Sequence, residues 1–536
     1  MSTLSCAKEG SYKKGVVFVQ ALSLREKIGQ RLVVGFPAFK LTEEYRALVR
    51  DYKVANVILF AENIESAEQL RALCTEIQTL VQKETGHPAF ITIDQEGGVV
   101  SRLSEQFAAV VPSAMAIAAT GDPHNAYLAG KITGEELAAL GVNFDLAPDM
   151  DVNSNPHNPV IGVRSYGDTP ETVCAYGTEM IRGLQAGGVL ATAKHFPGHG
   201  DTAVDSHLSL PMVDKSETEL EALELLPFRA AIDAGVAAIM TTHILFPQIE
   251  KENVPATMSR TLMTGLLRQK LGFRGLIVSD CMMMNAIQGY YGTVNGCVAA
   301  VKAGVDLVFT SHSVDFAREA CEALMRQAES GELSMEELDA SALRILHYKH
   351  AVDAAPRPPL ALVGCDAHRE FVRNAMEQAV TQVSDPLAPC PPLGANPLFL
   401  GCYPFRPTLA SSPEMKELSF PLFLAQHLGG EGLPTPTDPT QEEISALVKQ
   451  AQGHSCIVLG TYNGHIKQGQ LALAQALAQT GIPLICAALR NPYDLRNLPK
   501  SIYTLAVFEY DRNSLIAVAK VLTGKLTPMG RLSVTL

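Results

Sequence analysis

The sequence predicts an α/β protein in which a (β/α)8 TIM-type barrel is followed by a second α/β domain with a layered open sheet. Short apolar runs alternate with helical patterns along the first part of the chain. Parallel strands need a crossover connection, usually a helix, so this alternation predicts a parallel sheet. About eight such units over about 340 residues fit a closed barrel, and a doubly wound open sheet is the alternative.

Each expected strand of the barrel is a short apolar run, and each expected helix has an apolar face with polar residues opposite. The expected strands are residues 31–36, 56–60, 89–94, 144–150, 189–194, 237–242, 275–280 and 306–310. The clearest expected helices are residues 23–30, 66–83, 131–140, 171–186 and 217–233.

A proline-rich stretch at residues 353–359 divides the chain, because dense prolines end helices and favour a stiff extended linker. We therefore expect a catalytic barrel at residues 1–352 and a second α/β domain at residues 360–536. Apolar runs and helical patterns alternate again in the second part. The expected strands there are 398–402, 456–460, 484–488 and 505–508, and the expected helices are 368–383, 468–479 and 514–523.

The composition is that of an ordinary globular protein, with 47% hydrophobic and 18% charged residues among 536. The net charge of −13 argues against a nucleic-acid or acidic-membrane partner, because phosphate groups are bound by basic patches. Eleven scattered cysteines without a Cys-x-x-Cys pair indicate reduced thiols and a cytoplasmic protein. Neither a signal peptide nor a membrane-spanning segment is expected.

Polar residues follow the apolar runs at the places where a barrel enzyme carries its chemistry, the carboxyl ends of the strands. An open solvated rim of a barrel is the bland alternative for this pattern. His243 stays unassigned, because a histidine that ends an apolar strand is more often a satisfied structural group. The residues in these positions are Asp94, Asp149, Lys194, His195, His243 and Asp280.

The densest chemistry lies in the stretch from Lys194 to His207, Lys-His-Phe-Pro-Gly-His-Gly-Asp-Thr-Ala-Val-Asp-Ser-His. Lys194 and His195 are expected where a buried strand passes into a loop. Asp205 and His207 can form a pair in which the carboxylate orients the ring and raises its pKa, so that His207 acts as a general acid and base. A metal site made by His195, His199 and His207 and a plain polar loop are the alternatives.

This stretch, with Lys-His-Phe-Pro-Gly-His-Gly followed after four residues by Asp-Ser-His, resembles the signature of β-N-acetylglucosaminidases of glycoside hydrolase family 3. The resemblance implies that His207 is the proton donor and Asp205 its partner. It also implies that Lys194 and His195 hold the sugar. The metal alternative loses weight accordingly, and we expect neither a metal nor a cofactor.

Two further motifs match the same family. The loop from Asp94 to Arg102, Asp-Gln-Glu-Gly-Gly-Val-Val-Ser-Arg, resembles its sugar-binding loop, with Asp94 and Arg102 as ligands. A charged Asp and Arg can bind neighbouring hydroxyls, although alone this pattern is as often a surface salt bridge. Arg164, before Ser-Tyr-Gly where relatives usually have Ser-Phe-Gly, corresponds to another substrate contact.

Asp280 ends the strand Gly-Leu-Ile-Val-Ser-Asp and matches the catalytic nucleophile of the family. An Asp after a strand is often only a helix cap, and residues 282–287 do begin a helical pattern. The chain departs from many relatives immediately afterwards, with Cys281 and three methionines where they have an acidic or small residue. This change leaves Asp280 intact and alters at most the wall of the pocket.

The resemblance implies a retaining exo-acting enzyme that removes terminal β-linked N-acetylglucosamine, GlcNAc, with Asp280 as nucleophile. A histidine acid becomes neutral after giving up its proton, so it suits a substrate with negative charge near the cleaved bond. We therefore expect a GlcNAc-containing muropeptide or disaccharide as the substrate. A phosphorylase that uses phosphate in place of water and a non-catalytic cell-wall sugar-binding protein are the alternatives.

Overall fold

The computed structural model describes residues 21–202, 210–385, 387–406, 411 and 418–536. Eight parallel strands form the first sheet in the order β4-β3-β2-β1-β8-β7-β6-β5. Backbone bridges from Phe144 to Leu190 and from Asp149 to Lys194 join its two ends and close the barrel. The predicted TIM-type barrel is confirmed. The strands are β1 Leu32–Val34, β2 Asn56–Leu59, β3 Phe90–Ile93, β4 Phe144–Asp145, β5 Thr192–Phe196, β6 Ala238–Thr241, β7 Leu276–Cys281 and β8 Leu307–Thr310.

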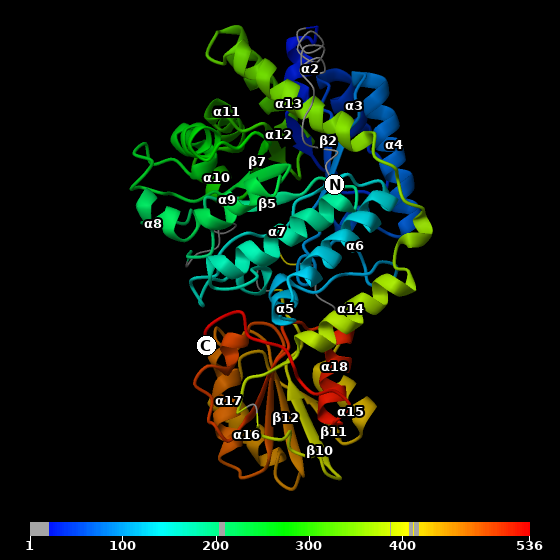
Figure 1. Ribbon diagram of the computed structural model, residues 1–536, viewed down its shortest axis with the longest axis vertical. Coiled ribbons are helices and arrows are strands. Elements are labelled where there is room, and N and C mark those ends of the chain that lie inside the picture. Colours follow the sequence, from blue (N-terminus) through cyan, green and yellow to red (C-terminus); the bar gives the residue numbers. More distant parts are fainter. Residues whose placement is uncertain (1–20, 203–209, 386, 407–410, 412–417) are drawn as a thin grey trace.

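Helices surround these strands on the outside of the barrel (Figure 1). They begin and end at standard signals. In α4, for example, the Ser66 hydroxyl accepts from the Gln69 amide, and Gly86 ends the helix in the left-handed conformation. The helices are α2 Leu24–Gly29, α3 Glu43–Tyr52, α4 Ala67–Thr85, α5 Ala114–Ala119, α6 His124–Leu140, α7 Pro170–Ala186, α8 Glu217–Ala222, α9 Leu225–Asp233, the π-helix η4 Thr261–Lys270, α10 Asn285–Gln288, α11 Thr293–Ala303, α12 Val314–Glu329 and α13 Met335–Asp353.

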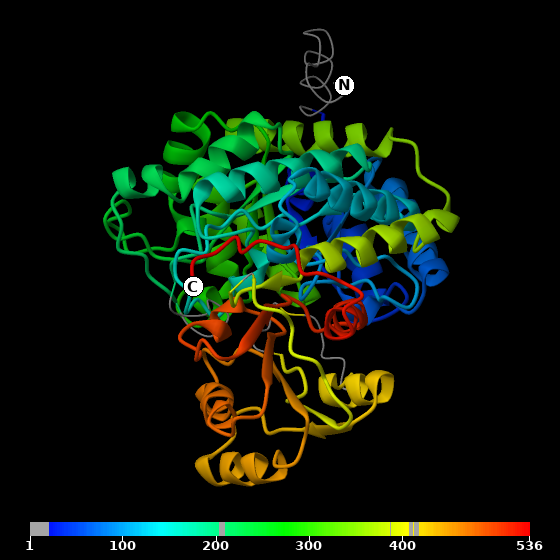
Figure 2. The ribbon, with the colours of Figure 1, turned by 60° about the horizontal axis from the view of Figure 1, so that its bottom comes forward.

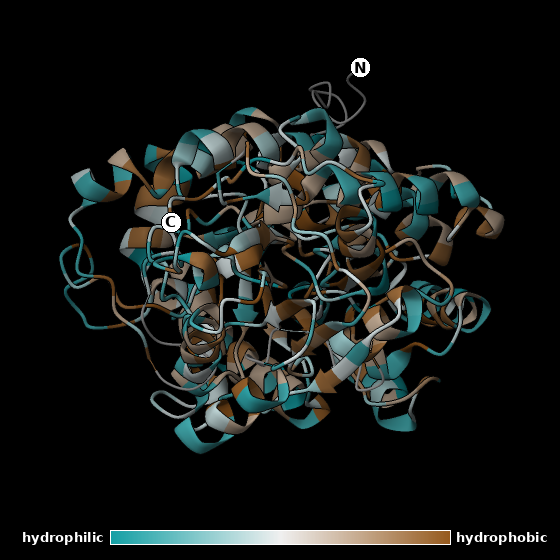
Figure 3. Ribbon diagram, turned by 90° about the horizontal axis from the view of Figure 1, so that it is seen from below, coloured by the Kyte–Doolittle hydropathy of each residue, from teal (hydrophilic) through white to brown (hydrophobic). Residues whose placement is uncertain are grey.

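The interior of the barrel is a packed core, in which the rings of Phe90 and Phe144 meet edge to face at 5.1 Å. Apolar side chains of β1, β2, β6, β7 and β8 complete this cluster. A second, larger cluster lies between the strands and the outer helices. Figure 3 shows hydrophilic residues concentrated on the outer helices and loops, as expected for helices with one buried face.

Three elements of the barrel differ from the sequence prediction. The expected strand 144–150 is short because Pro148 has no amide proton for the sheet. The expected strand 189–194 lies further along, so Lys194 and His195 are within β5 rather than after it. The expected helix 217–233 breaks into α8 and α9, because the ring of Pro227 would clash with the carbonyl of Leu223 in a continuous helix.

The second domain contains a six-stranded sheet in the order β11-β10-β12-β13-β14-β9. Five strands are parallel and β9 pairs antiparallel with β14, which confirms the expected α/β open sheet. Sequence reasoning missed β9 and β11, which are short or exposed. The strands are β9 Thr381–Gln382, β10 Pro397–Gly401, β11 Glu431–Pro434, β12 Cys456–Thr461, β13 Leu484–Ala488 and β14 Tyr503–Ala506; the helices are α14 Asp366–Ala379, α15 Phe420–Leu428, α16 Gln441–Gln450, α17 Gln468–Ala478 and α18 Arg512–Leu522.

The second domain lies below the barrel in Figure 1, and the C-terminal segment runs between the two domains in Figure 2. Its backbone is held by the barrel: the amide of Arg531 donates to the carbonyl of Ala119 at 2.8 Å. The amide of Thr535 donates to the carboxylate of Asp168 at 2.7 Å. The last residues therefore join the domains rather than trailing from the sheet.

The stretch between α13 and α14 is irregular apart from the short turn η5, Leu360–Leu362. Leu360, Val363 and Val372 nevertheless pack against the large cluster of the barrel. The helix α14 also contacts α5 of the barrel and α18 of the second domain. The boundaries proposed at residues 353–359 stay a prediction. No helix among the described residues has the length and apolar character needed to cross a membrane.

Candidate active site

A cavity of about 590 Å³ opens at the carboxyl ends of the barrel strands, on the side of the second domain. Its lining includes residues that follow β3, belong to β5 or end β7, which places three strand ends at one site. Asp205 and His207, the predicted acid/base pair, lie outside the described residues. The structure brings together the other six predicted site residues: Asp94, Arg102, Arg164, Lys194, His195 and Asp280.

Glu96 connects the cations on one wall of this cavity. Its carboxylate accepts two hydrogen bonds from the guanidinium of Arg164, both 2.8 Å long, and lies 2.6 Å from Nζ of Lys194. Asp94 lies 3.0 Å from the same Nζ and 3.5 Å from Nη2 of Arg102. Two carboxylates therefore hold three cations in fixed positions, as expected of a site that binds polar ligands.

Opposing effects set the protonation of this network. Burial would raise the pKa of Glu96, but Arg164 and Lys194 together hold that pKa well below its ordinary value. Burial would likewise lower the pKa values of Lys194 and Arg164, and Glu96 raises both. All three groups are consequently charged at neutral pH, and each depends on the others to remain so.

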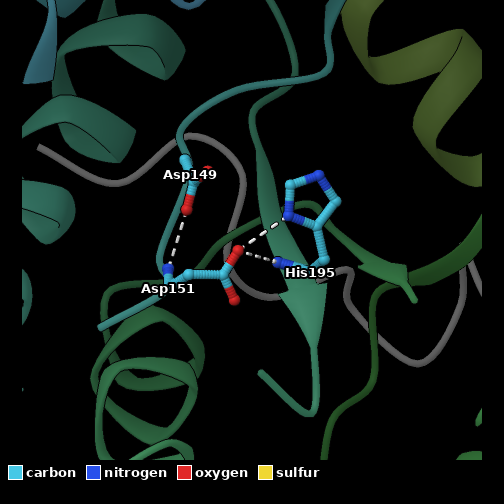
Figure 4. Close-up of side chains that lie close together, drawn as sticks. All are labelled: Asp149, Asp151 and His195. Atoms are coloured by element: carbon cyan, nitrogen blue, oxygen red, sulfur yellow. Dashed lines mark hydrogen bonds and ion pairs between the residues drawn. The ribbon is translucent and has the colours of Figure 1, made fainter. Parts of the chain in front are cut away.

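His195 is oriented by Asp151, as Figure 4 shows. The carboxylate of Asp151 lies 2.7 Å from Nδ1 of His195 and 3.3 Å from its backbone amide. The other ring nitrogen, Nε2, lies 3.4 Å from a guanidinium nitrogen of Arg164. A cation donates rather than accepts, so these partners assign the proton to Nδ1 and leave Nε2 as an acceptor.

Asp149, Asp151 and His195 are close enough to form a candidate metal site, with one ligand atom of each within 4.8 Å of the others. Protein donors already use part of this set. The amide of His199 donates to Asp151 at 2.6 Å and the amide of Asp151 donates to Asp149 at 2.8 Å, while Arg164 lies 3.6 Å from Asp149. The guanidinium supplies the positive charge that a metal would bring, which favours a buried charge network.

His199, the other described member of the alternative metal set, is buried with its Nδ1 2.8 Å from the hydroxyl of Thr202. Burial and then the nearby His195 lower the pKa of His199 to about 4, so its ring is neutral at physiological pH. Asp149 responds to burial in the opposite direction: burial and the neighbouring Asp151 raise its pKa well above the ordinary value.

Asp280 lies near the end of β7, where the pairing of β7 with β8 changes register between Val278 and Cys281. The amide of Cys281 donates to the Asp280 carboxylate at 2.6 Å. His243 stabilises the end of β7, because its Nε2 donates to the carbonyl of Cys281 at 3.0 Å. The unassigned His243 is thus a buried neighbour of the strand end that carries Asp280.

Gly97 and Gly98 lie in the loop between Asp94 and Arg102, with φ angles of +93° and +50°. At both glycines the backbone closely approaches other parts of the protein. A Cβ at Gly98 would lie 2.6 Å from Oε1 of Glu509 in the second domain. Glu509 also accepts from the amide of Ser113 at 2.6 Å, so the second domain supports the loop that carries Glu96 and Arg102.

Sequence reasoning missed several residues of the site. Glu96 stands two positions after Asp94, and a second carboxylate in one loop with an arginine was a usable signal. No sequence signal pointed to Asp151, because its role depends on the contact between the chain after β4 and strand β5. The aromatic wall, in which the Phe60 and His312 rings stack at 4.5 Å, comes from distant strand ends. Arg406 reaches the cavity from the second domain.

A TIM-type barrel with two carboxylates, three cations and a strand-end aspartate around one cavity defines a candidate hydrolase of polar ligands such as sugars. The comparison with known families is specific. Residues 23–348 match the N-terminal domain of glycosyl hydrolase family 3. The chain therefore belongs to glycoside hydrolase family 3, which confirms the resemblance drawn from its motifs.

Known proteins that are similar to this chain agree with this membership. The chain is 34% identical over 405 residues to β-hexosaminidase A of Pseudoalteromonas piscicida, covering 68% of each protein. It is 35% identical over 289 residues to a β-hexosaminidase of Neisseria meningitidis, covering 53% of this chain and 78% of the relative. A family 3 β-N-acetylglucosaminidase from Paenibacillus sp. superposes with a TM-score of 0.89 at 38% identity, covering 96% of this chain and 99% of that one.

Proposed function

We propose that the protein is a retaining, exo-acting β-N-acetylglucosaminidase that releases terminal β-linked GlcNAc, with Asp280 as the nucleophile. One observation carries the proposal: the Asp280 carboxylate lines the same cavity as the array of Asp94, Arg102, Arg164 and Lys194. The relatives at 34–38% identity include enzymes named for this activity, which supports the same substrate class.

The binding array suits a sugar ring bound through its hydroxyl groups. Asp94 can accept a hydroxyl proton, while Lys194 and Arg102 donate to neighbouring oxygens. Nε2 of His195 is an acceptor on the same wall, because Asp151 keeps the proton on Nδ1, and a ligand donor would share it with Arg164, which lies 3.4 Å away. Arg164 lies behind these groups and is held by Glu96, so it fixes the array as well as contributing charge.

The proposed reaction is a double displacement. Asp280 attacks the anomeric carbon while His207, held by Asp205, gives a proton to the oxygen of the leaving group. The glycosidic C–O bond breaks, and the sugar is joined covalently to Asp280. The neutral His207 then takes a proton from water, the water oxygen attacks the anomeric carbon, and the Asp280 carboxylate leaves. Two inversions give a product with retained configuration.

The leaving group is proposed to carry negative charge, as in a muropeptide. A histidine acid is neutral after proton transfer and does not repel such a group, whereas a carboxylic acid would become an anion. Arg406, which lines the cavity from the second domain, would attract the same charge. We propose a cytoplasmic location, which the ten free cysteines among the described residues support.

The test compares the parent enzyme with Asp280→Ala and His207→Ala on a nitrophenyl β-N-acetylglucosaminide, with a chelator present. We expect phenol release by the parent enzyme and a loss of roughly a thousandfold or more in Asp280→Ala, because this variant lacks the carboxylate that forms the covalent intermediate. Release of phenol needs little acid assistance, so His207→Ala should lose less on this substrate than on a muropeptide. Asp214→Ala, a change outside the cavity, is the control.

Three outcomes would contradict the proposal. An inactive parent enzyme would favour a sugar-binding protein, and loss of activity with chelator alone would favour a metal site. Formation of GlcNAc 1-phosphate in place of GlcNAc when phosphate is added would show a phosphorylase. Equal rates on neutral GlcNAc disaccharides and on muropeptides would remove the argument for an anionic leaving group while leaving the glycosidase itself intact.

A further inference from the structure

A second charged cavity lies at the amino ends of the strands, opposite the sugar cavity. Its volume is about 210 Å³, and it lies among η4, the start of β8 and the first turns of α13. In Figure 1, α13 crosses the top of the barrel, far from the second domain. This end of a TIM-type barrel usually contributes stability rather than chemistry, so a built cavity here requires an explanation.

The charges that line this cavity are unbalanced. Four arginines face two acids, which leaves an excess of two positive charges: Arg31, Arg260, Arg268 and Arg344 against Asp306 and Glu337. Burying like charges together is costly unless an opposite charge compensates them. This cost falls mainly on Arg31, which is buried, and on Arg268, whose side chain is 13% exposed.

Asp306 is fully occupied as the central acceptor. It is buried, pairs with Arg268, and lies 2.9 Å from Nη2 of Arg344. It also accepts from the hydroxyl of Ser341 at 2.7 Å and from the amide of Ile277 at 2.9 Å. Asp306 therefore has no capacity left for a further cation.

Arg31 is the cation of this cavity that has no carboxylate partner among the described residues. Its side chain lies deep in the barrel, with a residue exposure of 3%. One guanidinium nitrogen donates to the carbonyl of Val305, but Nε has no hydrogen-bond partner in the part of the chain that the structure describes. Among the described residues, Arg31 forms no ion pair within 4.0 Å, and Glu337 is already paired with Arg260 at 2.6 Å. A buried, unsatisfied N–H of a cation indicates a missing acceptor.

The size and the charge of the cavity both point to a small doubly charged anion. The volume is below the roughly 300–1,000 Å³ of pockets for drug-sized ligands, so a single ionic group fits and a whole sugar does not. Guanidinium groups match the oxygens of phosphate, which carries a charge of about −1.5 to −2 near neutral pH. This charge equals the excess left by the arginines.

We propose that this cavity is an anion site that takes a phosphate group, free or as a monoester, held by Arg31 and Arg344 with Arg260 at its mouth. Side-chain exposures of 32% for Arg344 and 56% for Arg260 give solvent access to it. The bound anion joins β1, β8, η4 and α13, so its binding stabilises the barrel from the face opposite the sugar cavity. The proposal does not rest on the proposed glycosidase function.

The test measures the thermal unfolding midpoint and the heat of binding with inorganic phosphate, at constant ionic strength maintained with sodium chloride. In the parent protein we expect the heat of binding to saturate and the midpoint to keep rising with the logarithm of the phosphate concentration once this exceeds Kd. Arg344→Gln should weaken phosphate binding by roughly tenfold or more, because it removes charged donors while leaving Arg31 in place. Arg31→Gln should have a similar effect if it folds.

Two control variants locate the site. Arg318→Gln removes an exposed charge on α12 that is paired with Asp315, and it should bind phosphate as the parent does. Arg102→Gln removes a cation of the sugar cavity and should also retain phosphate binding. Glucose 1-phosphate tested in the same way distinguishes the source. Tighter binding of the ester indicates a phosphate monoester, equal binding indicates that the site takes the phosphate group from either source, and binding of inorganic phosphate alone indicates the free ion.

Two results would overturn the proposal. One is the absence of a saturable effect of either compound on the parent protein. The other is a phosphate effect that persists in Arg344→Gln and disappears in Arg102→Gln, which would place the ion in the sugar cavity instead.

Discussion

At the scale of single residues, the site depends on a carboxylate that does not belong to the expected catalytic set. Glu96 bonds Arg164 through two hydrogen bonds and lies 2.6 Å from Lys194. Both cations are buried, so their charge is stable only while Glu96 is ionised. Glu96 is therefore the residue whose loss should affect both stability and substrate binding.

We predict that Glu96→Gln lowers the free energy of unfolding by about 3–5 kcal/mol, since it leaves two buried cations without their shared partner. It should also raise KM, because Lys194 and Arg164 lose their fixed positions. Denaturant unfolding and steady-state kinetics measure the two effects. Glu217→Gln, which removes an exposed partner of Lys270, is the matched control and should change neither. Unchanged KM and stability in Glu96→Gln would refute this role.

At the scale of elements, the loop between β3 and α5 has its shape set by the second domain. Gly97 and Gly98 turn it through left-handed conformations, and Ser113 and Glu509 lie against it. The loop carries Glu96 and Arg102 into the sugar cavity. A distortion of this loop should therefore weaken substrate binding indirectly, by displacing Glu96 and Arg102.

We predict that Gly98→Ala destabilises the protein and raises KM, because its Cβ would lie 2.6 Å from both Glu509 and Ser113. The control is Gly86→Ala at the end of α4, where φ is also positive but no atom lies within 4 Å of the added Cβ. The control should lose about 1–2 kcal/mol from the backbone conformation alone and keep its KM. The loss in Gly98→Ala should exceed this by about 1–3 kcal/mol, measured by denaturant unfolding. Equal losses in the two variants would show that Glu509 and Ser113 simply move aside.

At the scale of the whole molecule, the two domains are joined through a buried acid. Glu509 accepts from Ser113 across the interface, and burial and then the nearby Asp511 raise the pKa of Glu509 to about 8. The neighbouring carboxyls behave alike: burial and then Asp511 raise the pKa of Glu105 to about 7, and burial raises that of Asp511. The interface consequently favours protonated acids.

We predict that the contribution of Glu509 to stability falls as pH rises from about 4.5, the ordinary pKa of a glutamate, to about 8, its pKa in the folded protein. An acid whose pKa is higher in the folded than in the unfolded protein gives its full contribution below the unfolded value; the contribution is lost between the two values and does not change further above the folded value. Glu509→Gln keeps a carbonyl that can accept from Ser113 but cannot ionise, so its stability should change less over this range. Thermal unfolding at pH 5, 6, 7, 8 and 9 measures both proteins. A stability difference between the parent and Glu509→Gln that stays constant from pH 5 to pH 8 would contradict the prediction.

Much of the architecture could be predicted from local patterns. Strands such as β2, β3 and β8 are short apolar runs, and helices such as α4 begin and end at residues with specific capping chemistry. Six predicted site residues meet in one cavity because the carboxyl ends of parallel barrel strands must lie together. The break between α8 and α9 was missed although Pro227 signalled it, and the short strands β9 and β11 have too little pattern to detect.

The sequence by itself determined the barrel, the second sheet and the identity of the residues at the strand ends, because these depend on periodicity and on chemistry that neighbours in the chain share. Only the tertiary structure decided how those residues act together. Asp151 contacts His195 where the chain after β4 approaches β5. Glu509 contacts Ser113, beside Gly97 and Gly98, across a sequence separation of 396. Arg31 and Asp306, also far apart in the sequence, line one cavity. Such contacts leave no local pattern, since burial and charge compensation are properties of the packed molecule.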